Sequence, residues 1–177
     1  MKSSVRSMAT LVALFSVFTG SAMAQTPPEG VATKPAVQSA LMNISDADIL
    51  GVLSTLKPTS GELKVIQEKD EDGLTAFYAT VGENLLFSLY QYADESGKVT
   101  SFGLTFGFTV GRAVDPRVIN TWNSRQRFTK AFWDSVGDPM LSADLNVTSG
   151  VTRGAFSDWL KMFMQATQDY EKHVKTG

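Results

Sequence analysis

The residues that could do chemistry are few, and their types exclude most familiar active sites. The 177-residue chain contains no cysteine and a single histidine, His173. Thiolate catalysis, disulfides, cysteine-ligated zinc and a histidine-centred triad therefore cannot be built from one chain. His173 lies near the end of the last predicted helix, where the helix dipole favours a cation, so we predict that it caps this helix and binds no metal.

The carboxylates could bind calcium or act as the acid and base of a catalytic site. Asp70-Glu71-Asp72-Gly73 places three acids beside a glycine, but it lacks the spacing and terminal glutamate of an EF-hand loop. We predict a hairpin turn there. Asp134 and Asp138 lie on another predicted turn, and this position gives no reason for them to divide the acid and base roles of a glycosidase. No phosphate-binding, dinucleotide-binding or nucleophile-elbow motif is present. We therefore expect that the protein is not an enzyme and that it has no catalytic residue, cofactor or metal site.

Recognition is the other chemistry that the side chains offer. Trp122, Asn123, Arg125 and Arg127 lie close together in the sequence, and tryptophan and arginine often dominate interface energies. One hypothesis is that these four residues edge a peptide-binding groove. The alternative is that they hold the fold, with the asparagine bonding a turn or a neighbouring strand and the tryptophan acting as an apolar anchor.

The elements that must position these residues follow from the periodicity. Apolar residues recur at helical spacing in three segments and alternate in six others, between turns rich in Asp and Gly. The predicted helices span 45–56, 115–126 and 152–174, and the predicted strands span 62–67, 75–81, 85–92, 102–111, 128–133 and 140–147. This order predicts an α+β fold in which helices pack on an antiparallel sheet.

The predicted strand 102–111 has one bulky and one bare face. Its phenylalanines and Leu104 alternate with Gly103, Gly107 and Gly111. Glycine in a strand indicates close packing, strong twist or an open patch. We favour close packing or twist, and we retain a carrier of a small apolar ligand, bound between the bare face and a helix, as an alternative function.

The first 43 residues have the composition of a targeting segment and a leader. Lys2 and Arg6 precede an apolar run over 8–18, and Ala22-Met23-Ala24 matches a signal-peptidase site. The run is shorter than the ~20 residues that span a bilayer. We therefore expect a signal peptide over 1–24, a flexible leader over 25–43 and one domain over 44–177. Cleavage near Ala24 would leave the protein in the periplasm or secreted, without membrane insertion.

The overall composition fits a globular protein with no affinity for nucleic acid. Residues of the apolar set make up 43% of the chain, charged residues 19%, and the net charge is −2. A nucleic-acid groove needs clustered cations to displace counterions from phosphates. The mildly acidic balance argues against such a partner.

The segment from Ile119 to Ala131, containing Asn-Thr-Trp-Asn and then Arg-Phe, resembles the YbjN family, whose members are described as regulators of bacterial sensory transduction. The motifs Gly137-Asp138, Asp144-Leu145 and Ser149-Gly150-Val151-Thr152 extend this resemblance. It implies a fold similar to type III secretion chaperones, frequent pairing as dimers and no established catalytic activity.

These observations lead to one preferred function and two alternatives. We expect a chaperone-like or regulatory module of the cell envelope that binds an unidentified protein or peptide through its sheet edge or last helix, with a homodimer as a further expectation. The alternatives are the small-ligand carrier and a carboxylate-dependent hydrolase of envelope polymers. The hydrolase would need two acids that converge in a cleft, and Asp70, Asp134 and Asp138 are the acids to inspect.

Overall fold

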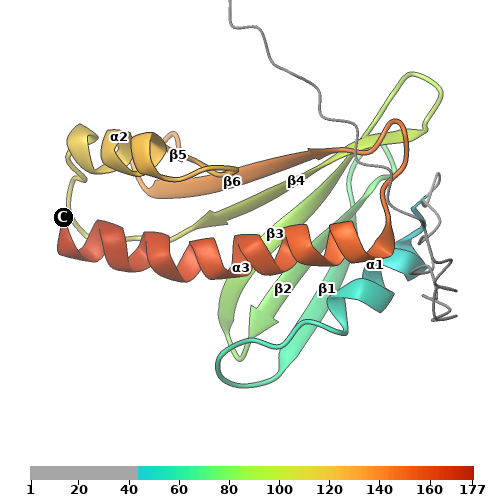
Figure 1. The fold of residues 1–177 in the computed structure, drawn as a ribbon, viewed down its shortest axis with the longest axis horizontal. Coiled ribbons are helices and arrows are strands. Elements are labelled where there is room, and N and C mark those ends of the chain that lie inside the picture. The colour runs from blue at the N-terminus through green and yellow to red at the C-terminus, as the bar shows by residue number, and fades with distance from the viewer. Residues whose placement is uncertain (1–43) are drawn as a thin grey trace, which may run out of the picture. The chain divides into compact units, whose positions relative to one another are not determined.

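The computed structural model describes residues 44–177, which form three helices and a six-stranded antiparallel sheet (Figure 1). The elements are α1 (Asp46–Leu53), β1 (Leu63–Lys69), β2 (Thr75–Val81), β3 (Asn84–Ala93), β4 (Val99–Gly107), α2 (Pro116–Arg125), β5 (Lys130–Trp133), β6 (Pro139–Asn146) and α3 (Arg153–Thr176). The α+β class and the order of elements are as predicted. The expected signal peptide and leader lie outside the described residues.

The sheet is a meander extended by a hairpin. Its strand order is β1-β2-β3-β4-β6-β5, so β1 and β5 are the edges and β3 is interior. β6 pairs with β4, and β5 then pairs with the outer side of β6. The long helix α3 crosses one face of the sheet (Figure 1). The core lies between that face and α3, where Phe102 meets Phe156 with ring centroids 5.2 Å apart.

Helix α1 begins with a capping box at Ser45. The Ser45 hydroxyl oxygen accepts a hydrogen bond from the Asp48 backbone N–H at 3.2 Å, and the Asp48 carboxylate accepts one from the Ser45 N–H at 3.2 Å. This reciprocal pair satisfies two N–H groups that a helix start leaves without partners. The helix ends at Leu53, earlier than predicted, but Leu56 beyond it is still buried in the core.

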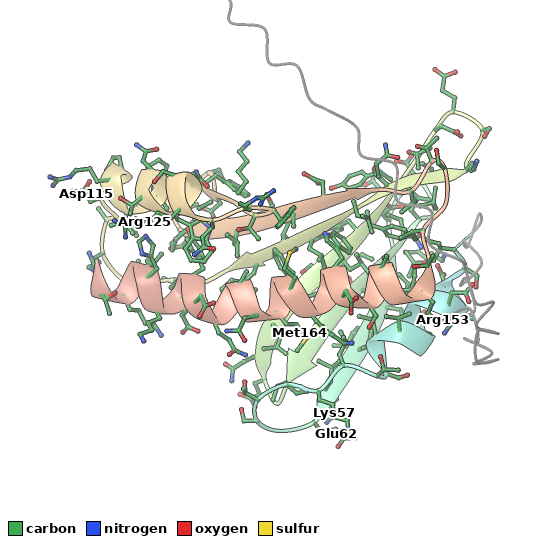
Figure 2. The ribbon with its side chains drawn as sticks, viewed as in Figure 1. Lys57, Glu62, Asp115, Arg125, Arg153 and Met164 are labelled. Carbon is green, nitrogen blue, oxygen red and sulfur yellow. The ribbon has the colours of Figure 1, made fainter. Side chains whose placement is uncertain are left out.

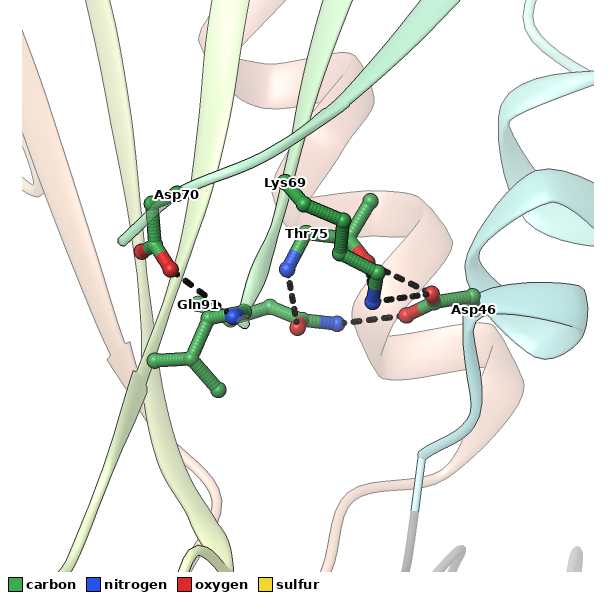
Figure 3. Close-up of polar contacts among 6 residues, drawn as sticks. Asp46, Lys69, Asp70, Thr75 and Gln91 are labelled. Carbon is green, nitrogen blue, oxygen red and sulfur yellow. Dashed lines mark hydrogen bonds and ion pairs between the residues drawn. The ribbon is translucent and has the colours of Figure 1, made fainter. Parts of the chain in front are cut away.

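A polar network docks α1 onto the sheet (Figure 3). The Thr75 hydroxyl donates to one oxygen of the Asp46 carboxylate at 2.6 Å, and the Gln91 amide donates to the other at 2.9 Å. The Gln91 carbonyl oxygen accepts from the Thr75 N–H at 3.0 Å, and the Lys69 ammonium lies 3.4 Å from Asp46. Burial disfavours the charged carboxylate, but these hydrogen bonds and the lysine outweigh it and lower the pKa of Asp46.

The predicted strand 102–111 is displaced in the structure. β4 begins earlier, at Val99, and ends at Gly107. Gly107 pairs with Met140, next to Pro139 at the start of β6. No β6 partner therefore exists for residues beyond Gly107, and the chain leaves the sheet there.

The bare glycine face of β4 points away from α3, and neighbouring side chains contact two of its glycines. A Cβ atom at Gly103 would lie 2.9 Å from Tyr92, and one at Gly107 would lie 2.1 Å from the Met140 sulfur. Close packing therefore explains Gly103 and Gly107, whereas a Cβ atom at Gly111, beyond the end of β4, would meet nothing within 4 Å. The alternative that placed a small ligand between this face and a helix was wrong about the geometry, since α3 packs on the opposite face.

Three hairpin loops share one pattern, an aspartate followed three residues later by a glycine. Each carboxylate accepts hydrogen bonds from the backbone N–H groups two and four residues further on, and each glycine has a positive φ of 79–91°. The pairs are Asp70 with Gly73, Asp94 with Gly97, and Asp134 with Gly137. The predicted turn at Asp70 is thus confirmed, and its carboxylate is occupied by the backbone.

Candidate functional site

Trp122, the central residue of the predicted binding motif, is a buried anchor. Its side chain is 4% exposed, and its indole N–H donates to the Thr129 hydroxyl oxygen at 3.2 Å. Its ring meets the Tyr170 ring edge-on at 5.0 Å, and burial raises the pKa of that phenol. Trp122 therefore joins α2 to α3 and to the loop after α2.

His173 lies in the last turn of α3, as predicted, and its side chain bonds the neighbouring helix α2. Its Nε2–H donates to the Val118 carbonyl oxygen of α2 at 2.9 Å, and its ring lies 5.7 Å from that of Trp122. The side chain therefore links the two helices.

Asn123 holds the edge of the sheet. Its amide nitrogen donates to the Ala131 carbonyl oxygen at 2.9 Å, and its amide oxygen accepts from the Ala131 N–H at 2.8 Å. Ala131 belongs to β5, so the asparagine pairs with the side of this edge strand that β6 leaves open. Trp122 and Asn123 thus have the fold-holding roles of the alternative hypothesis.

The loop between α2 and β5 contains a strained, exposed aromatic residue. The predicted strand 128–133 begins only at Lys130, because Phe128 has a φ of 67°. This left-handed backbone conformation costs roughly 1–2 kcal/mol in a residue with a Cβ atom. The Phe128 side chain is nevertheless 69% exposed, and the Arg127 guanidinium lies 5.0 Å from its ring centre. Backbone strain of this kind is common at binding and catalytic sites.

Phe128 forms part of an open groove of about 430 Å³ between this loop and α3, which we call the α2–α3 groove. Its lining residues are Trp122, Arg125, Gln126, Arg127, Phe128 and Thr129 on one side and Met162, Gln165, Ala166 and Asp169 on the other. Arg125 ends α2 near α3 (Figure 2). Of the four predicted residues, the groove contains Trp122, Arg125 and Arg127, whereas Asn123 points at β5.

The α2–α3 groove combines charge with apolar surface. Arg125 and Arg127 are exposed and form no ion pair within residues 44–177, whereas Asp169 on the opposite wall accepts hydrogen bonds from Gln165 at 3.3 Å. Met162 and Ala166 are half-buried and give α3 an apolar wall. This arrangement can hold an apolar side chain that has a carboxylate beside it.

Sequence reasoning missed the contribution of α3 to the groove, and it placed Phe128 in a strand. Met162 and Ala166 are more than thirty residues from the motif, and only the packing of α3 beside α2 brings them to it. A signal for Phe128 did exist, because this aromatic residue directly follows a run of polar residues at the end of a helix.

The acidic residues considered for hydrolysis do not all converge. Asp70 lies in the β1–β2 hairpin, whereas Asp134 and Asp138 share the β5–β6 hairpin near the other edge of the sheet. The Asp138 carboxylate accepts from the Thr109 hydroxyl at 2.8 Å, and that of Asp134 accepts from backbone N–H groups. Within the described part of the chain, no three His, Asp or Glu side chains are grouped so as to hold a metal ion. No helix among residues 44–177 has the length and apolarity to cross a membrane.

Comparison with known proteins identifies a family for this arrangement. No curated protein matches the chain. The sequence model of the YbjN family, described as "Putative bacterial sensory transduction regulator", matches residues 59–176. This match includes all six strands of the sheet, α2, α3 and both walls of the groove. The chain therefore belongs to the YbjN family.

Proposed function

We propose that this protein is a non-enzymatic regulatory module of the cell envelope that binds a segment of another protein in the α2–α3 groove. The observation that carries the proposal is Phe128, which is exposed and strained at the wall of that groove. The description of the family as a regulator supports a role other than catalysis.

The chemistry of the groove defines the partner. Arg125 and Arg127 provide two cations that form no ion pair within residues 44–177, although Asp169 lines the opposite wall, and guanidinium groups bind carboxylates through paired hydrogen bonds. Phe128, Met162 and Ala166 provide the apolar surface beside them. The partner segment therefore carries a large apolar side chain next to an aspartate or glutamate, and the groove acts on it in a chaperone-like way by shielding that side chain from water.

Export is the second part of the proposal, and it rests on the N-terminal sequence. Lys2, Arg6, the apolar run over 8–18 and Ala22-Met23-Ala24 have the order of a cleaved signal peptide. Mass spectrometry of the protein from its own cell envelope should find Gln25 as the first residue. Recovery with the first 24 residues intact, from the cytoplasm alone, would contradict export.

The binding proposal is tested by capture from an envelope extract with matched variants. The wild-type chain should retain a specific protein, which Phe128→Gly and the double variant Arg125→Gln, Arg127→Gln should lose. Val136→Ser is the control, because Val136 is also an exposed apolar residue, 81% accessible, but lies outside the groove. A partner retained equally by all four proteins would show that the groove is not the binding site.

A further inference from the structure

The two edge strands of the sheet differ in length and in whether a side chain bonds their outer backbone groups. At β5 the strand has four residues, and Asn123 occupies both backbone groups of Ala131. At the other edge, β1 has seven residues in unbroken register with β2, without a proline or bulge. Among residues 44–177, β1 pairs with β2 alone. Folded proteins commonly protect edges by shortening, bulging, covering or charging them, and of these devices β1 has only its charged side chains, Lys64, Glu68 and Lys69.

The sequence of β1 is self-complementary when the strand is reversed. If Ile66 is placed opposite Ile66 of a second antiparallel copy, Lys64 lies opposite Glu68 and Glu68 lies opposite Lys64. Val65 then lies opposite Gln67. Directly opposite residues of antiparallel strands have adjacent side chains, so this alignment creates two cross-strand ion pairs around an apolar centre.

We propose that β1 pairs with β1 of a second copy of this chain, antiparallel and with the two-fold axis through Ile66. The two sheets then form one continuous sheet with symmetric ion pairs between Lys64 and Glu68. A two-fold axis can pass through either type of antiparallel residue pair, so the hydrogen-bonding phase of β1 imposes no obstacle.

Exposure on both faces of β1 is consistent with this pairing. Ile66 is 52% exposed on the face away from α3, where it lies opposite Tyr78 of β2. Tyr78 in turn meets Tyr90 edge-on at 6.4 Å. Pairing would therefore join two apolar stripes at Ile66, each made of exposed Ile66 and half-buried Tyr78 and Tyr90. On the other face, Leu63 and Val65 line an open groove of about 610 Å³, which leaves space beside the strand.

Charge reversal and charge exchange test the alignment. Light scattering and sedimentation of the wild-type chain should give twice the monomer mass. Lys64→Glu and Glu68→Lys should each replace two attractive contacts by two repulsive ones and raise the dimer dissociation constant by at least about tenfold. The double variant Lys64→Glu, Glu68→Lys exchanges the charges and should restore the dimer. Circular dichroism of each variant checks the fold, which exposed substitutions should leave unchanged.

A cysteine placed at the axis tests the register directly. The chain has no cysteine, so Ile66→Cys introduces a single thiol that meets its own copy across the two-fold axis. Mild oxidation should cross-link this variant efficiently. Glu68→Cys is the control, because its two copies would lie about 14 Å apart along the strands. A monomer at several hundred micromolar would overturn the proposal. A dimer that ignores the charge reversals, or that cross-links no faster through position 66 than through 68, would also overturn it.

Discussion

The residues near the groove are of two kinds. Some stabilise the fold, and one has a strained backbone conformation that the rest of the fold maintains. Trp122 and Asn123 have partners for their polar groups. Phe128 has a left-handed backbone and an exposed ring. The segment from Trp122 to Phe128 thus contains two residues that stabilise the fold and the strained residue that they help to position.

Replacing Phe128 by glycine should separate stability from function. Glycine adopts a positive φ without steric cost, so Phe128→Gly should leave the free energy of unfolding unchanged or increase it by up to about 1 kcal/mol. Partner binding at the groove should be lost at the same time. Urea denaturation and the capture experiment measure the two effects. A clear loss of stability would mean that the ring supports the fold and would remove the main argument for its role in binding.

Replacing Asn123 should have the opposite result, because its amide holds the edge strand. Asn123→Ala removes two hydrogen bonds to Ala131 and should lower the free energy of unfolding by about 1–2 kcal/mol. Asn120→Ala is the matched control, since Asn120 is exposed on the same helix, and it should change stability by less than about 0.5 kcal/mol. Equal effects in the two variants would contradict a clamping role for Asn123.

At the scale of elements, α1 is attached to the body of the protein by two aspartates. Asp46 contacts the sheet through Thr75 and Gln91, and Asp48 forms an ion pair with Arg153 of α3 at 2.7 Å. Hydrogen bonds from Ser45, together with this arginine, lower the pKa of Asp48. Both attachments therefore depend on ionised carboxylates.

The stability of the protein should accordingly fall in acid. The pKa of Asp46 in the folded chain lies below its ordinary value of 3.8, so the stabilisation is complete above that value and is lost as the pH falls through the folded pKa. Asp46→Asn should be less stable than the wild type at pH 7 and should lose less on going to pH 3. Urea midpoints at both pH values measure this. The same loss in both proteins would show that Asp46 does not contribute to the pH dependence.

Elements were predictable where local chemistry determines them. The Ser45 cap of α1, the Asp115-Pro116 start of α2, the Thr152 cap of α3 and the Asp-Gly hairpins all follow from short-range patterns. The end of β4 and the start of β5 did not. Gly107 pairs with Met140, next to the first residue of β6, so the residues after Gly107 have no partner there, and Phe128 has a left-handed backbone. Each of those ends is determined by a distant segment or by backbone strain, which alternation alone does not encode.

The residues of the α2–α3 groove could also be predicted from the sequence only in part. Trp122, Arg125 and Arg127 could be selected from the sequence because their types favour interfaces. Met162 and Ala166 could not, because their positions on α3 resemble those of any half-buried helical residue until α3 is packed beside α2. The role of Asn123 likewise depends on where β5 lies.

At the scale of the whole molecule, the α2–α3 groove and the open strand lie at opposite edges of the sheet. β5, which Asn123 attaches to α2, is one edge, and β1 is the other. Adjacent strands are about 4.8 Å apart, so the two edges of a six-stranded sheet are separated by about 24 Å. Pairing through β1 would therefore leave both grooves of a dimer accessible and far apart.

This separation predicts bivalent binding. Two grooves on one rigid dimer should engage two copies of an immobilised partner, so the wild type should dissociate at least about tenfold more slowly from a dense surface than from a sparse one. Lys64→Glu should lose this dependence on density while keeping the affinity of a single groove, because Lys64 lies on β1 and outside the groove. Surface-binding kinetics at two partner densities measure the effect. If the dissociation rates of both proteins depend equally on partner density, bivalent binding does not need the pairing of β1.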